Sequence, residues 1–264
     1  MLQKSNGQIK KYMKNKIKSI IKDIIIKDDD IGFNNKKPRD SWLEENIKNI
    51  PKGKTILDAG AGELQYKNLC AHLQYTSQDF AKYDGVGNSE GRQTGSWDNS
   101  KIDIISDITS IPVKNESFDA IMCIEVFEHL PEPALAIKEF SRIIKSKGTL
   151  ILTAPFCSVT HFAPYYFANG YSKYWYEKIL KDNGFEIIEI DFNGNFFKYL
   201  AQELRHITMM EEKYTKQKGK IISRSPINIL ATKIILNLLN KLSQLNNKSE
   251  EILCFGLHVL AVKK

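Results

Sequence analysis

Hydrophobic residues in the first fifty positions recur with the spacing of α-helices. Between residues 8 and 27, mostly isoleucines appear every three or four positions with lysines between them, which predicts a basic amphipathic helix. A second, shorter helix is predicted over residues 41–50, with Asp40 or Ser41 as its N-cap and with Pro51 and Gly53 ending it. Residues 1–50 are therefore predicted to form an N-terminal helical extension.

From residue 55 onward, short hydrophobic runs alternate with helical patterns. Strands are predicted over residues 55–59, 73–78, 102–106, 118–124, 149–154 and 185–191, and helices over 133–145 and 172–182. Asn183 and Gly184 are typical of a C-terminal cap for the second of these helices. This alternation predicts an α/β fold with βαβ units and a mostly parallel sheet.

A long helical pattern over residues 197–247 interrupts this alternation. Its apolar stripe runs through Ile227, Leu230, Ile234, Ile235, Leu238, Leu239, Leu242 and Leu245. Residues 254–262 then have the pattern of a last strand that returns to the sheet. The predicted organisation is a domain over residues 51–264, with a helical insertion over 197–250 that serves as a lid or a cap.

The length and composition of the chain are those of a globular protein. The chain has 264 residues, 42% of them hydrophobic, so it can bury a sizeable core. It has no apolar run long enough to span a membrane and no signal-peptide pattern, so a soluble, cytoplasmic protein is expected. Its cysteines, Cys70, Cys123, Cys157 and Cys254, lack the spacing of metal ligands, so neither a disulfide framework nor a metal site is predicted.

The chain is basic, with a formal net charge of +7 and a pI of about 9.0. Such a charge suits nucleic acid or an anionic membrane surface. No basic patch with interleaved aromatic residues is present, so a nucleic-acid partner is not expected. The basic amphipathic segments are compatible with weak association with a membrane surface, although packing against the sheet is the simpler interpretation. The sequence leaves the oligomeric state open.

A glycine pair follows the first predicted strand. Gly60 and Gly62 let the backbone turn sharply and approach a ligand closely. A dinucleotide-binding loop would have a third glycine, whereas here Glu63 follows and would repel a pyrophosphate. Asp58, inside the end of the strand, instead suits a ligand that carries a positive ammonium or sulfonium group.

Acidic residues also follow the next two predicted strands. Asp79, with Phe80 beside it, ends the second strand, where a carboxylate can accept hydrogen bonds from ribose hydroxyls. Asp107 follows the third strand and is placed to accept the amine of an adenine, while Ile108 offers its backbone N–H to a ring nitrogen. Each acid alone is also typical of a strand-ending turn.

The segment from residue 56 to about 155 resembles the class I S-adenosylmethionine-dependent methyltransferases of the methyltransferase type 11 group. The similarity is carried by residues 57–62, 107–108, 111–112, 117–119, 125–130 and 139–152, all in order. It implies a Rossmann-like sheet of seven strands with the last strand antiparallel. Two departures are Leu64, where the family commonly has a further glycine, and the turn at residues 146–148.

The resemblance also implies roles for individual residues. Gly60 and Gly62 would pass under the methionine part of the cofactor, with Asp58 near its ammonium group. The ribose would be bound by Asp79 and the adenine by Asp107 and Ile108. The reacting sulfonium would be bordered by Cys123 and Glu125, at the end of the fourth strand.

Two histidines are candidate bases for the acceptor. His129 lies in the motif after the fourth strand, and His161 lies in an aromatic-rich loop after the fifth. Histidine can remove a proton from a hydroxyl group near neutral pH. A structural role for His129, beside Pro131, is an equally simple interpretation.

The sequence thus predicts a methyltransferase that uses S-adenosylmethionine and acts on a small-molecule or glycan acceptor at oxygen. The catalytic candidates are His129, His161 and Glu125. One alternative is a methyltransferase-like binding protein without catalytic activity. Another is an NAD-dependent oxidoreductase, which the missing third glycine and the absence of a suitably placed Tyr-x-x-x-Lys pair disfavour.

Overall fold

The structure is a computed structural model that describes residues 31–33, 35–216, 219 and 221–264. The chain divides into two compact units. The larger unit comprises residues 35–194 and 250–264, and the smaller comprises residues 195–249 with the described part of 1–34. The basic helix predicted over residues 8–27 lies outside the described residues.

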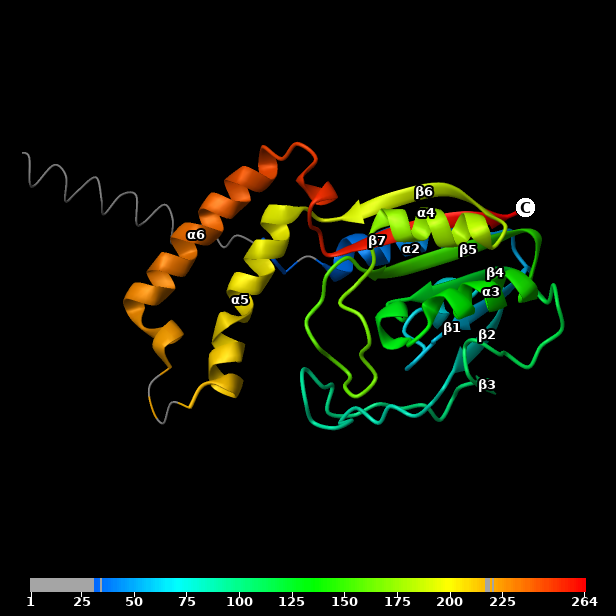
Figure 1. Ribbon diagram of the computed structural model, residues 1–264, viewed down its shortest axis with the longest axis horizontal. Helices are drawn as coiled ribbons and strands as arrows, with labels where there is room; N and C mark the ends of the chain where they lie inside the picture. The colour runs from blue at the N-terminus through cyan, green and yellow to red at the C-terminus, as the bar shows by residue number, and fades with distance from the viewer. Residues whose placement is uncertain (1–30, 34, 217–218, 220) are drawn as a thin grey trace, which may run out of the picture. The chain divides into compact units, whose positions relative to one another are not determined.

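The larger unit is built on one sheet of seven strands in the order β3-β2-β1-β4-β5-β7-β6 (Figure 1). The strands are β1 (Thr55–Ala59), β2 (Gln74–Asp79), β3 (Ile104–Ile105), β4 (Phe118–Ile124), β5 (Ile144–Pro155), β6 (Phe185–Asn193) and β7 (Gly256–Lys263). Only β7 runs antiparallel to its neighbours, β5 and β6. This confirms the predicted seven-stranded, mostly parallel sheet with an antiparallel last strand.

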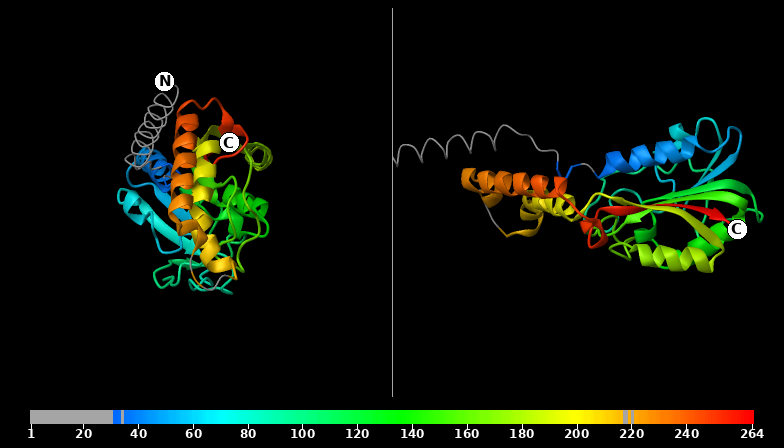
Figure 2. Two further views of the ribbon diagram at one scale, coloured as in Figure 1. Left: turned by 90° about the vertical axis from the view of Figure 1, so that its left-hand side faces the viewer. Right: turned by 90° about the horizontal axis from the view of Figure 1, so that it is seen from above.

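Helices cover both faces of this sheet (Figure 2). On one face, α2 (Lys36–Lys48) packs Leu43 into a cluster with Met122 of β4. On the other face lie α3 (Pro133–Ile143) and α4 (Lys173–Asp182), which contribute Phe140 and Tyr176 to a larger cluster with Ile121. Consecutive residues of β4 point to opposite faces, so its hydrophobic run over residues 120–124 is the pattern of a strand buried on both sides.

The helix predicted over residues 41–50 begins earlier in the structure, at Lys36. The prediction that Asp40 or Ser41 caps it is therefore wrong, because both lie inside α2 and Asn35 is at the cap position. Pro38 obscured this start in the sequence. A proline is tolerated in the first helical turn, where its missing N–H would have no partner in any case.

Other boundaries follow from local chemistry. The predicted cap of α4 is confirmed, because Asn183 is at the cap position and Gly184 has a φ of 79°, which favours glycine. β5 begins at Ile144, before the predicted start, because it pairs with Phe118 of β4 across an irregularity in register. β3 has two residues where five were predicted.

The described residues between 195 and 249 form two α-helices where one continuous helical pattern was predicted. These are α5 (Phe196–Tyr214) and α6 (Pro226–Gln244). The break lies before Pro226, which takes the first position of α6, while the Ser225 side chain accepts a hydrogen bond from the Asn228 N–H. A small core of Ile31, Ala201, Leu236 and Leu239 joins the helices. Among the described residues, no helix is both long and apolar enough to cross a membrane.

Candidate functional site

The predicted cofactor residues gather at the carboxyl ends of the central strands. The chain runs outward from β1 in one direction through β2 and β3, and in the other through β4 and β5. In open α/β sheets, ligands bind where the strand order reverses in this way. The loops that follow β1 and β4 are therefore the expected floor of a binding site.

The loop after β1 requires glycine at two positions. Gly60 and Gly62 have φ values of 77° and 50°, in the left-handed region. A Cβ atom on Gly60 would lie 2.5 Å from Cγ2 of Val126, and one on Gly62 would lie 2.6 Å from Cζ2 of Trp97. Both the backbone conformation and the close neighbours therefore exclude larger side chains.

Asp58 is buried in the sheet, next to this loop. Its carboxylate accepts one hydrogen bond from the Tyr75 hydroxyl at 2.7 Å. Burial raises the pKa of Asp58 to about 7; the Tyr75 hydrogen bond opposes this rise, and the nearby Asp79 charge adds to it. A positively charged ligand would compensate the buried carboxylate, as predicted for an ammonium group.

Asp79 ties the end of β2 to the glycine loop. One carboxylate oxygen accepts a hydrogen bond from the Gly62 N–H at 3.0 Å, and the other accepts one from the Ala81 N–H at 2.8 Å. The N–H groups of Gly60 and Ala61 also donate to the Gln78 carbonyl. The predicted ribose acid is thus held by the backbone of the predicted methionine loop.

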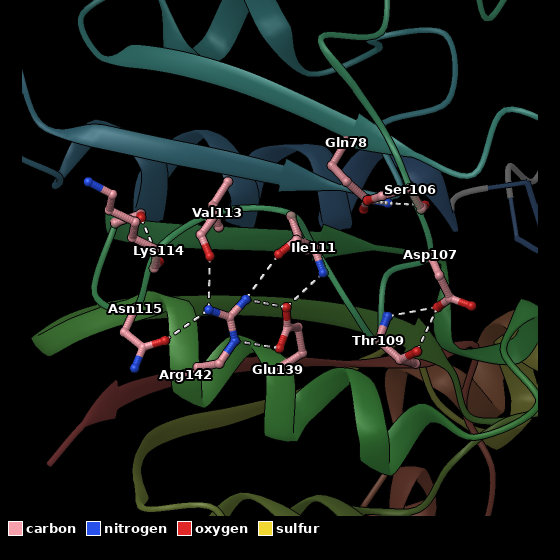
Figure 3. A network of polar contacts seen from close by, with 11 residues as sticks. Gln78, Ser106, Asp107, Thr109, Ile111, Val113, Lys114, Asn115, Glu139 and Arg142 are labelled. Carbon is pink, nitrogen blue, oxygen red and sulfur yellow. Dashed lines mark hydrogen bonds and ion pairs between the residues drawn. The ribbon is translucent and has the colours of Figure 1, made fainter.

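Asp107 and Ile108 lie in the connection that follows β3. One oxygen of Asp107 accepts hydrogen bonds from the N–H and the hydroxyl of Thr109, at 2.8 and 2.7 Å (Figure 3). These bonds lower the pKa of the exposed Asp107 carboxyl, which is therefore ionised at neutral pH. The Ser106 N–H donates to the Asp79 carbonyl at 3.1 Å, which places this connection beside the end of β2.

A charged pair on α3 fixes the rest of this connection (Figure 3). Arg142 donates to the carbonyls of Ile111 and Val113 and to the side chain of Asn115. Glu139 accepts two hydrogen bonds from Arg142 and one from the Ile111 N–H. The backbone polar groups of a non-repetitive segment are thereby satisfied, and Asp107 leads into an anchored chain.

The predicted residues at the end of β4 have different environments. Cys123 is buried in the apolar cluster, and burial raises the pKa of its thiol well above its usual value. Glu125 has a φ of 57° and accepts a hydrogen bond from the Thr153 hydroxyl. It also forms an ion pair with Arg39 of α2, at 2.7 Å. The sequence analysis did not identify Arg39, because nothing in its local pattern indicates this distant partner.

The two candidate bases lie together. The rings of His129 and His161 are 4.7 Å apart between centroids. His129 ends the short 3-10 helix η2 (Phe127–His129), and His161 is held by pairing between its own loop and Arg92 in the loop after β2. A third residue, Glu128, brings one carboxylate oxygen within 3.7 Å of Nε2 in both rings.

Burial determines the protonation of these three side chains. It lowers the pKa of His129 to about 4, with a further contribution from His161, and it also lowers the pKa of His161. Both imidazoles are therefore neutral at pH 7. Burial and the Glu125 charge raise the pKa of the Glu128 carboxyl well above its usual value. Glu128 is 1% exposed.

Aromatic side chains surround the two histidines. Phe162 stacks on His129 with centroids 5.1 Å apart, and Tyr166 lies 5.2 Å from His161. Phe80, a predicted cofactor-binding residue, meets Tyr165 edge to face, with 4.9 Å between ring centroids. Further along the chain, the rings of Tyr171, Trp175 and Tyr176 pack on Phe127 and not on the histidines.

Glu128, like Arg39, is a site residue that sequence reasoning missed. It stands in the motif at residues 125–130, next to a histidine that attracted the catalytic assignment. The loop after β5 lies against this residue, because the N–H groups of Phe167 and Ala168 donate to the Glu128 backbone carbonyl. Only a long-range contact of this kind distinguishes a buried glutamate from one at an ordinary helix start.

Comparison with known proteins agrees with this arrangement. Residues 57–152 match the family model of a methyltransferase domain. The chain is 29% identical over 104 residues to a ubiquinone biosynthesis O-methyltransferase of Xanthomonas oryzae pv. oryzae (strain PXO99A). This match covers 38% of the chain and 43% of the relative, so it spans less than half of the relative's length. The family resemblance predicted from the sequence motifs is confirmed.

Solved structures are similar over more of the chain but at low identity. A SAM-dependent methyltransferase from Archaeoglobus fulgidus is 17% identical, with a TM-score of 0.49 over 84% of this chain and 92% of that one. Phosphoethanolamine N-methyltransferase 2 from Haemonchus contortus, in complex with S-adenosyl-L-methionine, is 15% identical. Its TM-score is 0.48, over 86% of this chain and 52% of that one.

Proposed function

Residues 57–152 form a methyltransferase domain of the class I S-adenosylmethionine-dependent family, and on this premise we propose that the protein methylates an oxygen atom of a small-molecule or glycan acceptor. The observation that carries the proposal is the row of carboxylates, Asp58, Asp79 and Asp107, at or just beyond the ends of three neighbouring strands. We assign residues 51–264 to this domain, with residues 197–250 as an insertion.

The residues at this edge fit the charges of S-adenosylmethionine. Asp58 offers a buried carboxylate to the methionine ammonium group. Arg39, whose buried Nε has no hydrogen-bond partner, offers a cation to the methionine carboxylate. Asp79 is assigned to the ribose hydroxyls, and Asp107 with Ile108 to the adenine. Gly60 and Gly62 support this assignment. A Cβ atom at either position would collide with a neighbouring side chain, so only the bare backbone of glycine fits in this loop.

When bound, S-adenosylmethionine supplies a methyl group that its sulfonium already activates. The protein therefore has to align the acceptor and exclude water. Phe162, Tyr165 and Tyr166 provide apolar surroundings for this alignment. His129 and His161, both neutral, are assigned to the acceptor side of the site, with Glu125 nearby.

Oxygen is the proposed acceptor atom for two reasons. The curated relative is named an O-methyltransferase, which supports the same chemistry here. In addition, a hydroxyl acceptor is protonated at neutral pH and needs a hydrogen-bond acceptor or base beside it, which the two imidazoles supply.

The direct test is methyl transfer from isotopically labelled S-adenosylmethionine to panels of phenols, oligosaccharides and amines. We expect labelled ethers from a phenol or sugar, and at least about tenfold weaker transfer after Asp79→Ala, which removes hydrogen bonds to the ribose. Asp182→Ala, which removes an exposed acid of α4, serves as the matched control. Methylated amines alone would contradict an oxygen acceptor. S-adenosylmethionine binding without transfer to any panel would favour the non-catalytic alternative.

We also propose that the protein acts in the cytoplasm and associates weakly with anionic membrane surfaces. The four cysteines are free thiols, which suits a reducing compartment.

The evidence for the membrane surface comes from α6 and its cap. Four apolar residues recur there on one side of the helix, and their exposed fractions are 75% for Ile227, 45% for Ile234, 54% for Leu238 and 79% for Leu245. The helix has lysines and no acidic residue, which complements an anionic surface.

Vesicle co-sedimentation tests this association. We expect binding to vesicles that contain anionic lipid, and its loss in a double variant with Ile234→Glu and Leu238→Glu. Ile188→Glu changes an equally exposed isoleucine on β6 and should leave binding intact. Equal sedimentation of all three proteins, or none with anionic vesicles, would contradict the membrane proposal and leave the methyltransferase proposal untouched.

A further inference from the structure

We propose that Glu128, His129 and His161 bind one divalent transition-metal ion. Each side chain offers one ligand atom, and these three atoms all lie within 4.8 Å of one another. Two of the separations, from the Glu128 carboxylate oxygen to the Nε2 atoms of His129 and His161, are 3.7 Å. These separations are too long for direct hydrogen bonds. A small inward movement would place all three atoms at the distance of about 2 Å that nitrogen and oxygen ligands keep from zinc.

Hydrogen bonds on the far side of each ring fix which nitrogen faces this space. Nδ1 of His129 lies 2.6 Å from the Tyr165 carbonyl, and Nδ1 of His161 lies 2.9 Å from the Val159 carbonyl. A carbonyl only accepts hydrogen bonds, so Nδ1 carries the proton in both rings. Nε2 is therefore the nitrogen of each ring that can offer a lone pair toward Glu128. A histidine that ligates a metal is commonly oriented in this way by a backbone carbonyl.

The carboxylate is the second indication of a ligand. Glu128 is 1% exposed, and its Oε2 has no hydrogen-bond partner within the described structure. A buried carboxylate is costly unless it is paired or coordinates a metal ion. Its other oxygen faces the Nε2 lone pairs of His129 and His161, which cannot donate a hydrogen bond to a carboxylate. A cation at the centre would satisfy all three groups together.

Access and charge also suit an ion. The side chains of His129 and His161 are 14% and 22% exposed, so an ion can reach the site from solvent. Glu125 adds a nearby negative charge, whereas Arg92 adds a positive one. Arg39 already pairs with Glu125 at 2.7 Å.

The ligand types indicate which ion binds. Two imidazoles and one carboxylate suit zinc and its borderline neighbours such as cobalt and nickel, rather than magnesium or calcium, which prefer oxygen. Three protein ligands also leave a position open for water or for an acceptor oxygen, as in catalytic zinc sites. With an ion bound, both Nε2 lone pairs would be coordinated, so the open position on the ion, in place of the free imidazoles, would face the acceptor oxygen. The loops after β4 and β5 together supply the ligands, so binding would link these two loops.

Cobalt(II) titration of the purified full chain, after treatment with a chelator, tests the site, because bound cobalt absorbs visible light according to its ligands. We expect one ion per chain, a visible absorption band and a rise in melting temperature. Glu128→Gln and His161→Asn should each weaken binding at least about tenfold. His206→Ala is the matched control, because His206 also contacts a glutamate, Glu203, at 3.3 Å on α5.

His161→Asn changes a loop residue, so it keeps the test valid if the buried Glu128→Gln variant does not fold. Loss of the cobalt band in the site variants, with the band kept in His206→Ala, would support the proposal. Equal binding by all variants, or no band in the unmodified protein at millimolar cobalt, would overturn it. Titration with S-adenosylhomocysteine is independent of these results, so failure of the metal site is distinguishable from failure of the proposed function.

Discussion

The chemistry of Asp58 depends on its protonation. Its carboxyl has one hydrogen bond, from Tyr75, and burial raises its pKa to about 7. Near neutral pH the free protein is therefore a mixture of protonated and ionised forms. A ligand with an ammonium group favours the ionised form, so binding of the cofactor releases a proton whenever Asp58 is protonated.

We predict that the affinity for S-adenosylhomocysteine falls as pH is lowered. Below a pH of about 7, the affinity should decrease by about tenfold per pH unit, because Asp58 must be deprotonated before it can pair with the ammonium group. Tyr75→Phe removes the hydrogen bond to the carboxylate and should move the midpoint to higher pH. Calorimetric titration between pH 5 and pH 8 measures the profile, and a flat profile would contradict the role of Asp58.

Leu64 is one of the two places at which the chain departs from the family pattern. Its φ of 62° is in the left-handed region, which costs a leucine about 1–2 kcal/mol relative to the ordinary helical conformation. Its N–H donates to the Ala61 carbonyl, so the loop keeps a tight turn. The sequence indicated a change at this position, but only the backbone angle shows that the leucine adopts a conformation that glycine favours.

The Leu64→Gly variant should therefore be more stable than the Leu64→Ala variant. Both variants lose the leucine side chain, but only glycine relieves the strain, which predicts a difference of about 1 kcal/mol in the free energy of unfolding. Urea denaturation of the two variants measures this difference directly. Equal stabilities, or a more stable alanine variant, would show that the backbone is not strained at Leu64.

At the scale of elements, the strands were predicted more successfully than the segments between them. The hydrophobic run of β4 identified a strand buried on both faces, and its predicted bounds match those observed. The helix α2 was placed too late because Pro38 is compatible with a first turn. The connection after β3 has no repeating pattern, because its conformation depends on hydrogen bonds to Arg142 and Glu139 of α3.

That dependence predicts the effect of Arg142→Ala. The substitution leaves the carbonyls of Ile111 and Val113 without their partner, and we expect a loss of about 2 kcal/mol in the free energy of unfolding. It should also weaken binding of S-adenosylhomocysteine, because Asp107 then leads into a loosened chain. Arg224→Ala removes an exposed ion pair with Glu212 and should change stability by less than about 0.5 kcal/mol. Equal effects of the two substitutions would contradict the anchoring role of Arg142.

At the scale of the whole molecule, the two units have cores of very different size. The sheet of the larger unit buries a cluster on each face, whereas the described part of the smaller unit has one cluster of four buried residues, made by Ile31 together with Ala201 of α5 and Leu236 and Leu239 of α6. The helical insertion was predicted from its apolar stripe. That stripe does not show which residues are buried, and several of its members are exposed on α6.

Hydrogen exchange should reveal this difference. We predict that amides of α5 and α6 exchange faster than those of β4, β5 and β7, because opening the smaller unit exposes less buried surface. S-adenosylhomocysteine should slow exchange in the loops after β1, β2 and β3 of the larger unit. Uniform protection across both units would contradict the prediction from core size.

The most direct test of the proposed function is calorimetric titration with S-adenosylhomocysteine. We predict one site per chain with micromolar affinity, the same affinity in Asp182→Ala, and affinity at least about tenfold weaker in Asp79→Ala. NAD should give no binding. An unmodified protein that does not bind S-adenosylhomocysteine, or one that binds NAD in its place, would contradict the assignment of the carboxylate row to a methyl-donor cofactor.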